Sequence, residues 1–428
     1  MRAERYVLIA SVYNIPAAAA AATPAPAVPF RHHSMLYQRL AWVPAAESYF
    51  PHTRTKLTTS PASGSTSLLS IHRRRITTAS LQVTSMSDQS MGESWCGHGL
   101  FNTVTTDWVQ DHLDDPEVAI IDIRGRVNKA REEGSDYFFT TYEGLKDDYL
   151  DAHIPGAAFV DWTKDIAGED ANGVPTQLTD REGFMVAMQE RGVGGSKRVV
   201  AYDNGEMLFA TRFWWAMRRR FGHDRVSVMD GGWAKWIAEG RQITPDCPCP
   251  LKVFSEWEIG PEKERPEIWA SMGDVRAAME DGKTQVLDAR SKAQYKGEVR
   301  RSLLGGHIPG AVNTPYRDFL ETRTGKEGEY RVLKRLDGIR QVFDSAKVDT
   351  SPSAPPIIAY CNGGVASTLA LFGLYQLDQH RRASAPAGDG EEGGRNEPAV
   401  PERFSPAWSN YDGSWNEWGN IETAPVER

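Results

Sequence analysis

The chain of 428 residues repeats itself, and this repetition limits the folds it can adopt more than any other feature. The motif His153-Ile-Pro-Gly-Ala157 recurs letter for letter as His307-Ile-Pro-Gly-Ala311. An apolar run ending in Asp-x-Arg precedes each motif, and an apolar run ending in Ala-Tyr follows it. The landmarks keep their order in both copies, which predicts that one fold occurs twice. The other pairs are Val118–Arg124 with Gln285–Arg290, Val199–Glu206 with Ile357–Gly364, and Asp230–Trp233 with Asp412–Trp415.

Each copy alternates short apolar runs with amphipathic stretches of helical length. This alternation is typical of an α/β fold, with a mostly parallel sheet flanked by helices in each domain. In such sheets, ligands bind at the carboxyl ends of the strands. We expect a first domain over residues 96–244, a linker rich in proline and charge over 245–265, and a second domain over 266–428.

Cys361 is the candidate nucleophile. The apolar run Pro356–Tyr360 predicts a buried strand that delivers Cys361 into a glycine-rich turn, and a helix is expected from there through Leu377. Backbone N–H groups in such a turn form an anion-binding nest, and a helix N-terminus adds positive potential. This setting favours a thiolate, the nucleophilic form of cysteine. The alternative is a small buried cysteine beside a turn.

The first copy carries Asp203 where the second carries Cys361. A carboxylate cannot accept sulfur as a thiolate does. The first domain is therefore expected to be catalytically silent.

These landmarks resemble the two-domain rhodanese sulfurtransferases, which comprise the thiosulfate and 3-mercaptopyruvate sulfurtransferases. The likeness rests on tandem Asp-x-Arg, His-Ile-Pro-Gly-Ala and Asp-Gly-x-Trp motifs with a cysteine in the second loop only, and it covers about Asp107 to Arg428. It implies that Cys361 takes a sulfane sulfur from a small anionic donor as a persulfide and passes it to cyanide or to a thiol, such as thioredoxin or glutathione. We expect a monomeric or weakly associated protein that needs no metal and no nucleotide cofactor.

The resemblance assigns substrate-binding roles to the loop that follows the cysteine. The family pattern Cys-x-x-Gly-Val-Thr is matched at Gly364 and Val365, whereas Ala366 replaces the threonine and a hydroxyl follows at Ser367. Loop N–H groups are expected to bind the persulfide charge, with Ser367 Oγ as a further donor. Thiosulfate enzymes carry basic side chains in this loop, so the small residues here favour 3-mercaptopyruvate as donor. The expected loop contacts are Asn362, Gly363, Gly364, Val365, Ala366 and Ser367.

Arginines elsewhere in the second copy are expected to bind the anionic donor. Arg300, in Glu298-Val-Arg300, matches a substrate-binding arginine of the family. The family's other substrate arginine falls at Gln294, and Arg301 or Lys296 could replace it.

Arg290 also matches a family arginine, and we expect it to bind substrate unless it forms an ion pair with Asp288. His153 and His307 precede Pro-Gly turns, and as a repeated pair they are expected to pack and form hydrogen bonds rather than act as bases.

Two other functions remain open. A non-catalytic module that binds a partner or senses oxidants is favoured by Ala366 and Gln294, which depart from the family pattern. A phosphatase of related fold would use a loop arginine to bind phosphate, and residues 362–368 contain none.

The first 90 residues are expected to be a disordered organelle-targeting leader. Up to Ser87 they are rich in Ala, Ser, Thr and Arg, and their only acids are Glu4 and Glu47. This composition favours a mitochondrial transit peptide, with a plastid as the second choice, and translation from Met86 would leave the product in the cytoplasm.

The remaining composition narrows the class of protein further. A net charge of −8 argues against a nucleic-acid partner, and no later apolar run is long enough to span a membrane. Cys96, Cys247 and Cys249 show no disulfide framework, which indicates a reducing compartment. Residues 381–403 contain few apolar residues and are expected to form a disordered insertion after the active-site helix.

Overall fold

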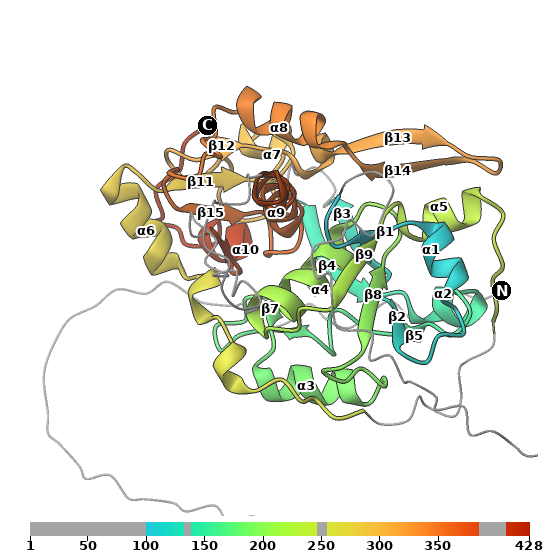
Figure 1. Ribbon diagram of the computed structural model, residues 1–428. Helices are drawn as coiled ribbons and strands as arrows, with labels where there is room; N and C mark the ends of the chain where they lie inside the picture. Colours follow the sequence, from blue (N-terminus) through green and yellow to red (C-terminus); the bar gives the residue numbers. More distant parts are fainter. Residues whose placement is uncertain (1–99, 132–137, 246–254, 385–407) are drawn as a thin grey trace, which may run out of the picture. The chain divides into compact units, whose positions relative to one another are not determined.

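Two parallel five-stranded sheets with the same strand order form the two repeats (Figure 1). The computed structural model describes residues 100–131, 138–245, 255–384 and 408–428. The duplicated α/β fold predicted from the repeats is confirmed. The first sheet has the order β1 (Thr103–Val104), β9 (Val226–Met229), β8 (Arg198–Tyr202), β2 (Val118–Asp122) and β5 (Ala158–Phe159). The second has β10 (Trp269–Ala270), β16 (Trp408–Tyr411), β15 (Ile357–Tyr360), β11 (Gln285–Asp288) and β12 (Val312–Asn313).

The central strands β8 and β15 consist mainly of apolar residues because helices cover both faces of a parallel sheet. All four residues of β15 are buried, and only Arg198 of β8 is half-buried. The carboxyl ends of these strands deliver Asp203 and Cys361 to equivalent loops. The helices are α1 (Thr106–Asp111), α2 (Lys146–Asp151), α3 (Arg181–Gln189), α4 (Leu208–Trp214), α5 (Gly232–Ala238), α6 (Met272–Asp281), α7 (Lys292–Tyr295), α8 (Leu336–Ser345), α9 (Ser367–Ala383) and α10 (Ser414–Trp418). A π-helical turn (Trp215–Arg220) extends α4, and 3₁₀ turns cover Pro261–Lys263, Pro266–Ile268 and Tyr316–Phe319.

The helices that follow the two loops, α4 and α9, pack against each other. Thr211 Oγ1 lies 3.0 Å from Thr368 Oγ1, and the ring of Trp214 meets Phe372 edge-on with 4.7 Å between centroids. One apolar cluster includes residues of both repeats, so the two domains share a core. Both repeats belong to one compact unit.

Hairpins make reciprocal contacts between the domains. In the second domain, β13 (Leu320–Thr324) and β14 (Glu329–Leu333) extend to α5, where Leu333 N–H donates to Asp230 Oδ1 at 2.9 Å (Figure 1). In the first domain, β7 (Gln177–Leu178) pairs with β6 (Ala167–Gly168), and Leu178 N–H donates to Asp412 Oδ2 at 2.7 Å. The aspartate of each Asp-Gly-x-Trp motif thus accepts a hydrogen bond from the other domain. A third hairpin, β3 (Gly125–Arg131) with β4 (Phe138–Gly144), belongs to the first domain.

The predicted insertion begins too early in the sequence. Helix α9 continues to Ala383, and Arg381 and Arg382 both pair with Asp378, at 3.3 and 2.7 Å. These ion pairs hold the last turn of the helix, so residues 381–383 are helical. The rest of the insertion, residues 385–403, lies outside the described residues.

The predicted linker is ordered along the first domain over residues 255–265. Trp257 is buried, Glu256 O accepts from Gly195 N–H at 3.2 Å, and Glu264 pairs with Arg220 at 2.6 Å. The leader, the start of the first domain, Met86 and the other three cysteines lie outside the described residues.

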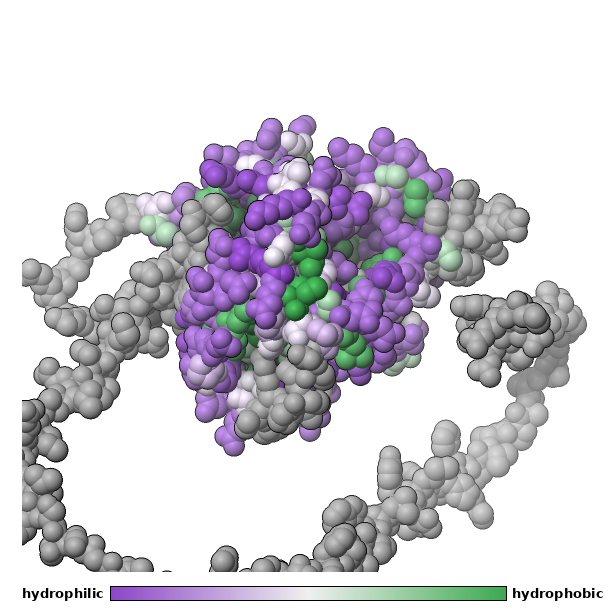
Figure 2. Space-filling view, turned by 90° about the vertical axis from the view of Figure 1, so that its right-hand side faces the viewer, coloured by the Kyte–Doolittle hydropathy of each residue, from purple (hydrophilic) through white to green (hydrophobic). Residues whose placement is uncertain are grey.

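The surface drawn in Figure 2 is mostly hydrophilic, and its apolar residues form small separate groups. In that view the described residues present no broad apolar patch of the kind that marks a stable interface. Within the described ranges, no helix is long and apolar enough to cross a membrane.

Candidate active site

Cys361 lines a cavity of about 700 Å³ together with residues of both domains. Its side chain is buried, with 3% of the residue exposed. The first domain contributes Tyr142, Glu206 and Phe209 to the wall, among others, and the second contributes Arg301. A small molecule that reaches the sulfur is therefore enclosed by both repeats.

Ser414 fixes the start of the cysteine loop. Its Oγ accepts hydrogen bonds from the N–H groups of Cys361 (3.1 Å) and Gly364 (2.9 Å) and donates to Tyr411 O at 2.6 Å. Ser414 does this from a left-handed conformation, with φ of 50°. The prediction that Gly364 N–H binds the persulfide is therefore wrong, because that group is already bonded to Ser414.

The first copy has glycine where the second has Ser414. Gly232 has nearly the same φ of 53°, but a Cβ there would lie 2.6 Å from Asp203 O. The hydroxyl of Ser414 thus occurs only in the repeat that carries the cysteine. The sequence shows this difference within the Asp-Gly-x-Trp repeat, but nothing in the motif itself indicates a contact with the cysteine loop.

The silent loop shows where the backbone of such a loop directs its N–H groups. Asp203 Oδ1 accepts from Gly205 (2.8 Å) and Met207 (3.1 Å), and Oδ2 accepts from Phe209 (3.0 Å) and Ala210 (3.3 Å). Burial raises the pKa of Asp203, and the four N–H donors oppose that rise. An anion at this position is therefore surrounded by backbone donors.

The second loop aligns with the silent loop without a gap, and Cys361 stands at the place of Asp203. Gly363, Val365 and Ser367 match the first three of the N–H donors around that carboxylate. Among the described residues, no protein acceptor bonds Gly363 N–H or Val365 N–H. These groups are available to the sulfur of Cys361 or to a second sulfur attached to it.

Ser367 lies next to the sulfur, as predicted. Its Oγ is 3.6 Å from Cys361 Sγ and 2.6 Å from Asn410 Oδ1, so its single proton points mainly toward Asn410. The hydroxyl is thus close to the sulfur although it stands one residue later than in the family pattern. The other predicted loop residues Asn362, Gly363, Val365 and Ala366 line the cavity.

The silent domain holds the carbonyl side of the loop. Thr176 Oγ1 lies 2.9 Å from Gly363 O, although its single proton points mainly toward Pro175 O at 2.5 Å. Arg212 Nη1 donates to Gly364 O at 3.2 Å. Arg212 also forms a buried ion pair with Asp412 and donates to Thr176 O at 3.1 Å. In a peptide plane the N–H points opposite to the C=O, so the bond from Arg212 to Gly364 O directs Val365 N–H to the other side of the loop. The N–H opposite Gly363 O is that of Gly364, which bonds Ser414. The sequence analysis missed Thr176 and Arg212, because nothing in the local pattern around them indicates a contact with the other repeat.

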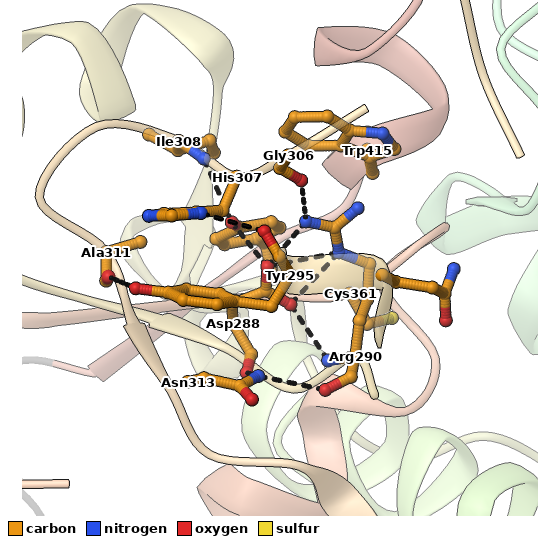
Figure 3. A network of polar contacts seen from close by, with 12 residues as sticks. Asp288, Arg290, Tyr295, Gly306, His307, Ile308, Ala311, Asn313, Cys361 and Trp415 are labelled. Carbon is orange, nitrogen blue, oxygen red and sulfur yellow. Dashed lines mark hydrogen bonds and ion pairs between the residues drawn. The ribbon is translucent and has the colours of Figure 1, made fainter. Parts of the chain in front are cut away.

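Arg290 is held by its own domain. Its Nε donates to Asp288 Oδ1 at 3.0 Å, its Nη2 donates to Gly306 O at 2.7 Å, and its guanidinium lies 4.1 Å from the ring centre of Trp415 (Figure 3). The ion-pair alternative considered from the sequence therefore describes this residue. Burial by the surrounding protein opposes the charge of Arg290, but Asp288 keeps its pKa above the usual value.

The silent domain repeats this arrangement. Arg124 Nε donates to Asp122 Oδ2 at 2.9 Å, its Nη2 donates to Ala152 O at 2.7 Å, and its guanidinium lies 4.3 Å from the ring centre of Trp233. Since a domain without the cysteine keeps the same contacts, they belong to the fold. The histidine pair is repeated too. His307 stacks on Tyr295 (Figure 3). His153 stacks in the same way on Tyr149, as expected of packing residues.

Arg301, rather than Arg300, lies on the cavity wall, which corrects the sequence prediction. The stem of Arg300 packs against Gly305, where a Cβ would lie 2.9 Å from Arg300 Cγ. Residues 297–306 adopt no regular helix or strand, so neighbouring side chains point in unrelated directions. Burial lowers the pKa of Arg301, and the charges of Tyr316 and Cys361 oppose that shift. Gln294, which stands where the family has its other substrate arginine, also lines the cavity and donates to Asn362 Oδ1 at 3.0 Å. Lys296, the other residue considered as a replacement for that arginine, pairs with Glu298 at 3.9 Å.

Two parallel-sheet repeats with one loop cysteine are the arrangement of two-domain sulfurtransferases. Comparison with known proteins agrees with this assignment. The family model of the rhodanese-like domain matches twice, over residues 105–239 and 271–421. The chain belongs to the rhodanese family, as the sequence motifs indicated. In the part of the chain that the structure covers, no three His, Cys, Asp or Glu side chains are grouped to hold a metal ion.

Similar proteins cover most of the described chain. The 3-mercaptopyruvate sulfurtransferase of Escherichia coli (strain K12) is 32% identical over 333 residues, which is 76% of this chain and 97% of that protein. Thiosulfate/3-mercaptopyruvate sulfurtransferase 1, mitochondrial, of Arabidopsis thaliana is 26% identical over 76% of this chain and 77% of that protein. The crystal structure of SseA from Escherichia coli covers 73% of this chain and 98% of its own, with a TM-score of 0.54 and 31% identity.

Proposed function

We propose that the protein moves a sulfane sulfur from 3-mercaptopyruvate, and less efficiently from thiosulfate, through a persulfide on Cys361. The thiolate attacks the donor sulfur, the S–S bond forms, and the bond from that sulfur to carbon or to the sulfonate sulfur breaks. The observation that carries the proposal is the position of Cys361 in a loop whose silent twin surrounds a carboxylate with four N–H donors. Gly363 N–H and Val365 N–H, which match two of those donors and have no protein acceptor among the described residues, support a persulfide anion.

Arg301 is the proposed contact for the donor's carboxylate. It lies on the same cavity wall as Cys361, and its charge interacts with the sulfur. A guanidinium forms strong charge-assisted hydrogen bonds with a carboxylate. Asn362 and Gly363 place no charge beside the sulfur, which favours 3-mercaptopyruvate over the compact thiosulfate dianion.

The acceptor is proposed to be a thiol, such as glutathione or thioredoxin, or cyanide. The cavity of about 700 Å³ is larger than either donor needs, which leaves room for a small acceptor beside the bound persulfide. The persulfide's outer sulfur is attacked by the acceptor thiolate, and Cys361 leaves as a thiolate. The protein is proposed to work as a monomer.

The leader supports a mitochondrial location, with a plastid as the second choice and the cytoplasm if translation starts at Met86. The Arabidopsis relative carries the word mitochondrial in its name. Import of a fluorescent protein fused to residues 1–90 distinguishes the three compartments.

Steady-state kinetics with both donors test the proposal. Native protein is expected to show the higher kcat/KM with 3-mercaptopyruvate, and Cys361→Ser is expected to abolish turnover with both donors while melting at a similar temperature. Turnover near the native level in Cys361→Ser would reject the cysteine as carrier, and a preference for thiosulfate would reject the donor assignment.

A further inference from the structure

Tyr142 carries a hydroxyl proton that has no acceptor among the described residues. The residue comes from β4 of the silent domain, yet it lines the cavity that contains Cys361. Its Oη accepts a hydrogen bond from Asn416 Nδ2 at 2.9 Å. An amide N–H₂ group only donates, so this bond leaves the phenol's own proton free for another partner.

The surrounding contacts fix where Tyr142 lies. Its ring meets Trp162 edge-on, with 5.7 Å between centroids. Asn416 is held in turn by the cysteine loop, because its backbone N–H donates to Asn362 O at 2.7 Å. A Cβ on Gly363 would lie 2.8 Å from Asn416 Nδ2, so the glycine leaves space for the amide. The hydroxyl is thereby placed beside the reacting loop.

The phenol is protonated in the resting enzyme. Burial raises the pKa of Tyr142 to about 12, the Asn416 bond opposes this, and the negative charge of Cys361 adds to it. The influence of Cys361 agrees with the cavity geometry, in which both side chains face the same space. Tyr142 therefore offers a proton at neutral pH rather than a negative charge.

We propose that Tyr142 is a catalytic residue that moves the proton of the 3-mercaptopyruvate thiol to the departing pyruvate. This inference rests on the proposed function. The Cys361 thiolate attacks the thiol sulfur, the C–S bond breaks, and its electron pair remains on the three-carbon fragment as an enolate. Tyr142 gives its proton to the enolate, which becomes pyruvate, and takes back the proton of the newly formed persulfide. The sulfur is oxidised, the carbon is reduced, and no external proton is consumed.

Thiosulfate provides the matched comparison. When Cys361 attacks its outer sulfur, sulfite leaves as a stable dianion and no proton moves. A proton-transfer residue should therefore matter for 3-mercaptopyruvate and not for thiosulfate, whereas a residue that only supports the loop should matter equally for both.

The test is the single-turnover rate of persulfide formation on Cys361, followed by quenching and mass spectrometry, in native protein and Tyr142→Phe. The variant is expected to be slower with 3-mercaptopyruvate by on the order of a hundredfold and close to native with thiosulfate. Tyr330→Phe, on the hairpin strand β14 and outside the cavity lining, is the control and should match native protein with both donors.

Chemical rescue gives a second readout that needs only 3-mercaptopyruvate. Added phenol is expected to accelerate Tyr142→Ala, which leaves a space for it, and not Tyr142→Phe. Equal slowing of Tyr142→Phe with both donors, or no slowing with 3-mercaptopyruvate, would overturn the assignment. If thiosulfate does not load native protein, rescue decides, and its absence in Tyr142→Ala overturns the assignment. If native protein forms no persulfide with either donor, the proposed function itself fails.

Discussion

At the scale of single residues, Arg301 is the cation expected to control donor affinity. Replacing it by alanine removes a half-buried charge from the cavity wall. The loss of a charge-assisted contact of about 2 kcal/mol corresponds to a decrease of about thirtyfold in kcat/KM for 3-mercaptopyruvate. Steady-state kinetics measure this decrease.

Arg300→Ala is the matched control, since the two arginines are adjacent in sequence but only Arg301 lines the cavity. It should reduce kcat/KM much less. A larger effect of Arg300→Ala than of Arg301→Ala would show that the sequence match, rather than the cavity geometry, identifies the donor site.

Single residues also mark the limit of prediction from sequence. Cys361 and Ser367 could be predicted because a strand, a glycine turn and a helix follow one another within a dozen residues. Arg301 could not be chosen over Arg300, since an irregular segment has no periodicity that fixes which side chain faces inward. Tyr142 and Thr176 reach the site only through the packing of the other domain.

At the scale of elements, helix α4 of the silent domain holds the catalytic loop through Arg212. We expect Arg212→Leu to lower the free energy of unfolding by about 3–5 kcal/mol, because it leaves the buried carboxylate of Asp412 without its counter-charge. The same change removes one donor to Gly364 O and leaves the bond from Asn410 Nδ2 at 3.0 Å, and it should reduce the rate of persulfide formation.

A double-mutant cycle with Asp412→Asn separates the ion pair from lost packing. Denaturant unfolding of both single variants and the double variant should show a double effect well below the sum of the single effects. Additive effects would mean that the two side chains do not interact in solution.

The order of elements was largely predictable. Paired motifs in one order predict two copies of one sheet, and alternating apolar and amphipathic runs predict parallel strands with helices. The reciprocal hairpin contacts were not predictable, because they join Leu178 to Asp412 and Leu333 to Asp230 across the domain boundary. The insertion start was misplaced because arginine-rich composition hides the last helical turn, which Asp378 stabilises.

At the scale of the whole molecule, the first domain packs against the catalytic loop, and we expect its stability to depend on pH through His223. This imidazole is fully buried, its Nε2 donates to Gly194 O at 3.1 Å, and burial lowers its pKa to about 4 from the usual 6.5. The unfolded chain therefore binds a proton between pH 6.5 and 4 that the folded protein does not. Folding stability should fall by about 3 kcal/mol as pH decreases through this window.

Denaturant midpoints at several pH values in native protein and His223→Asn measure this contribution. The variant should be less stable at neutral pH but lose less stability on acidification. Parallel pH profiles for the two proteins would show that His223 does not titrate abnormally.

The central claim is that Cys361 carries the transferred sulfur in a loop held by both domains. The most direct measurement is the mass of the Cys361 peptide after one incubation with 3-mercaptopyruvate and removal of excess donor. We predict the mass of one additional sulfur atom on that peptide, its loss on addition of a thiol, and no such addition in Cys361→Ser. An unmodified Cys361 peptide in protein that still produces pyruvate, or a sulfur on another peptide, would contradict the account.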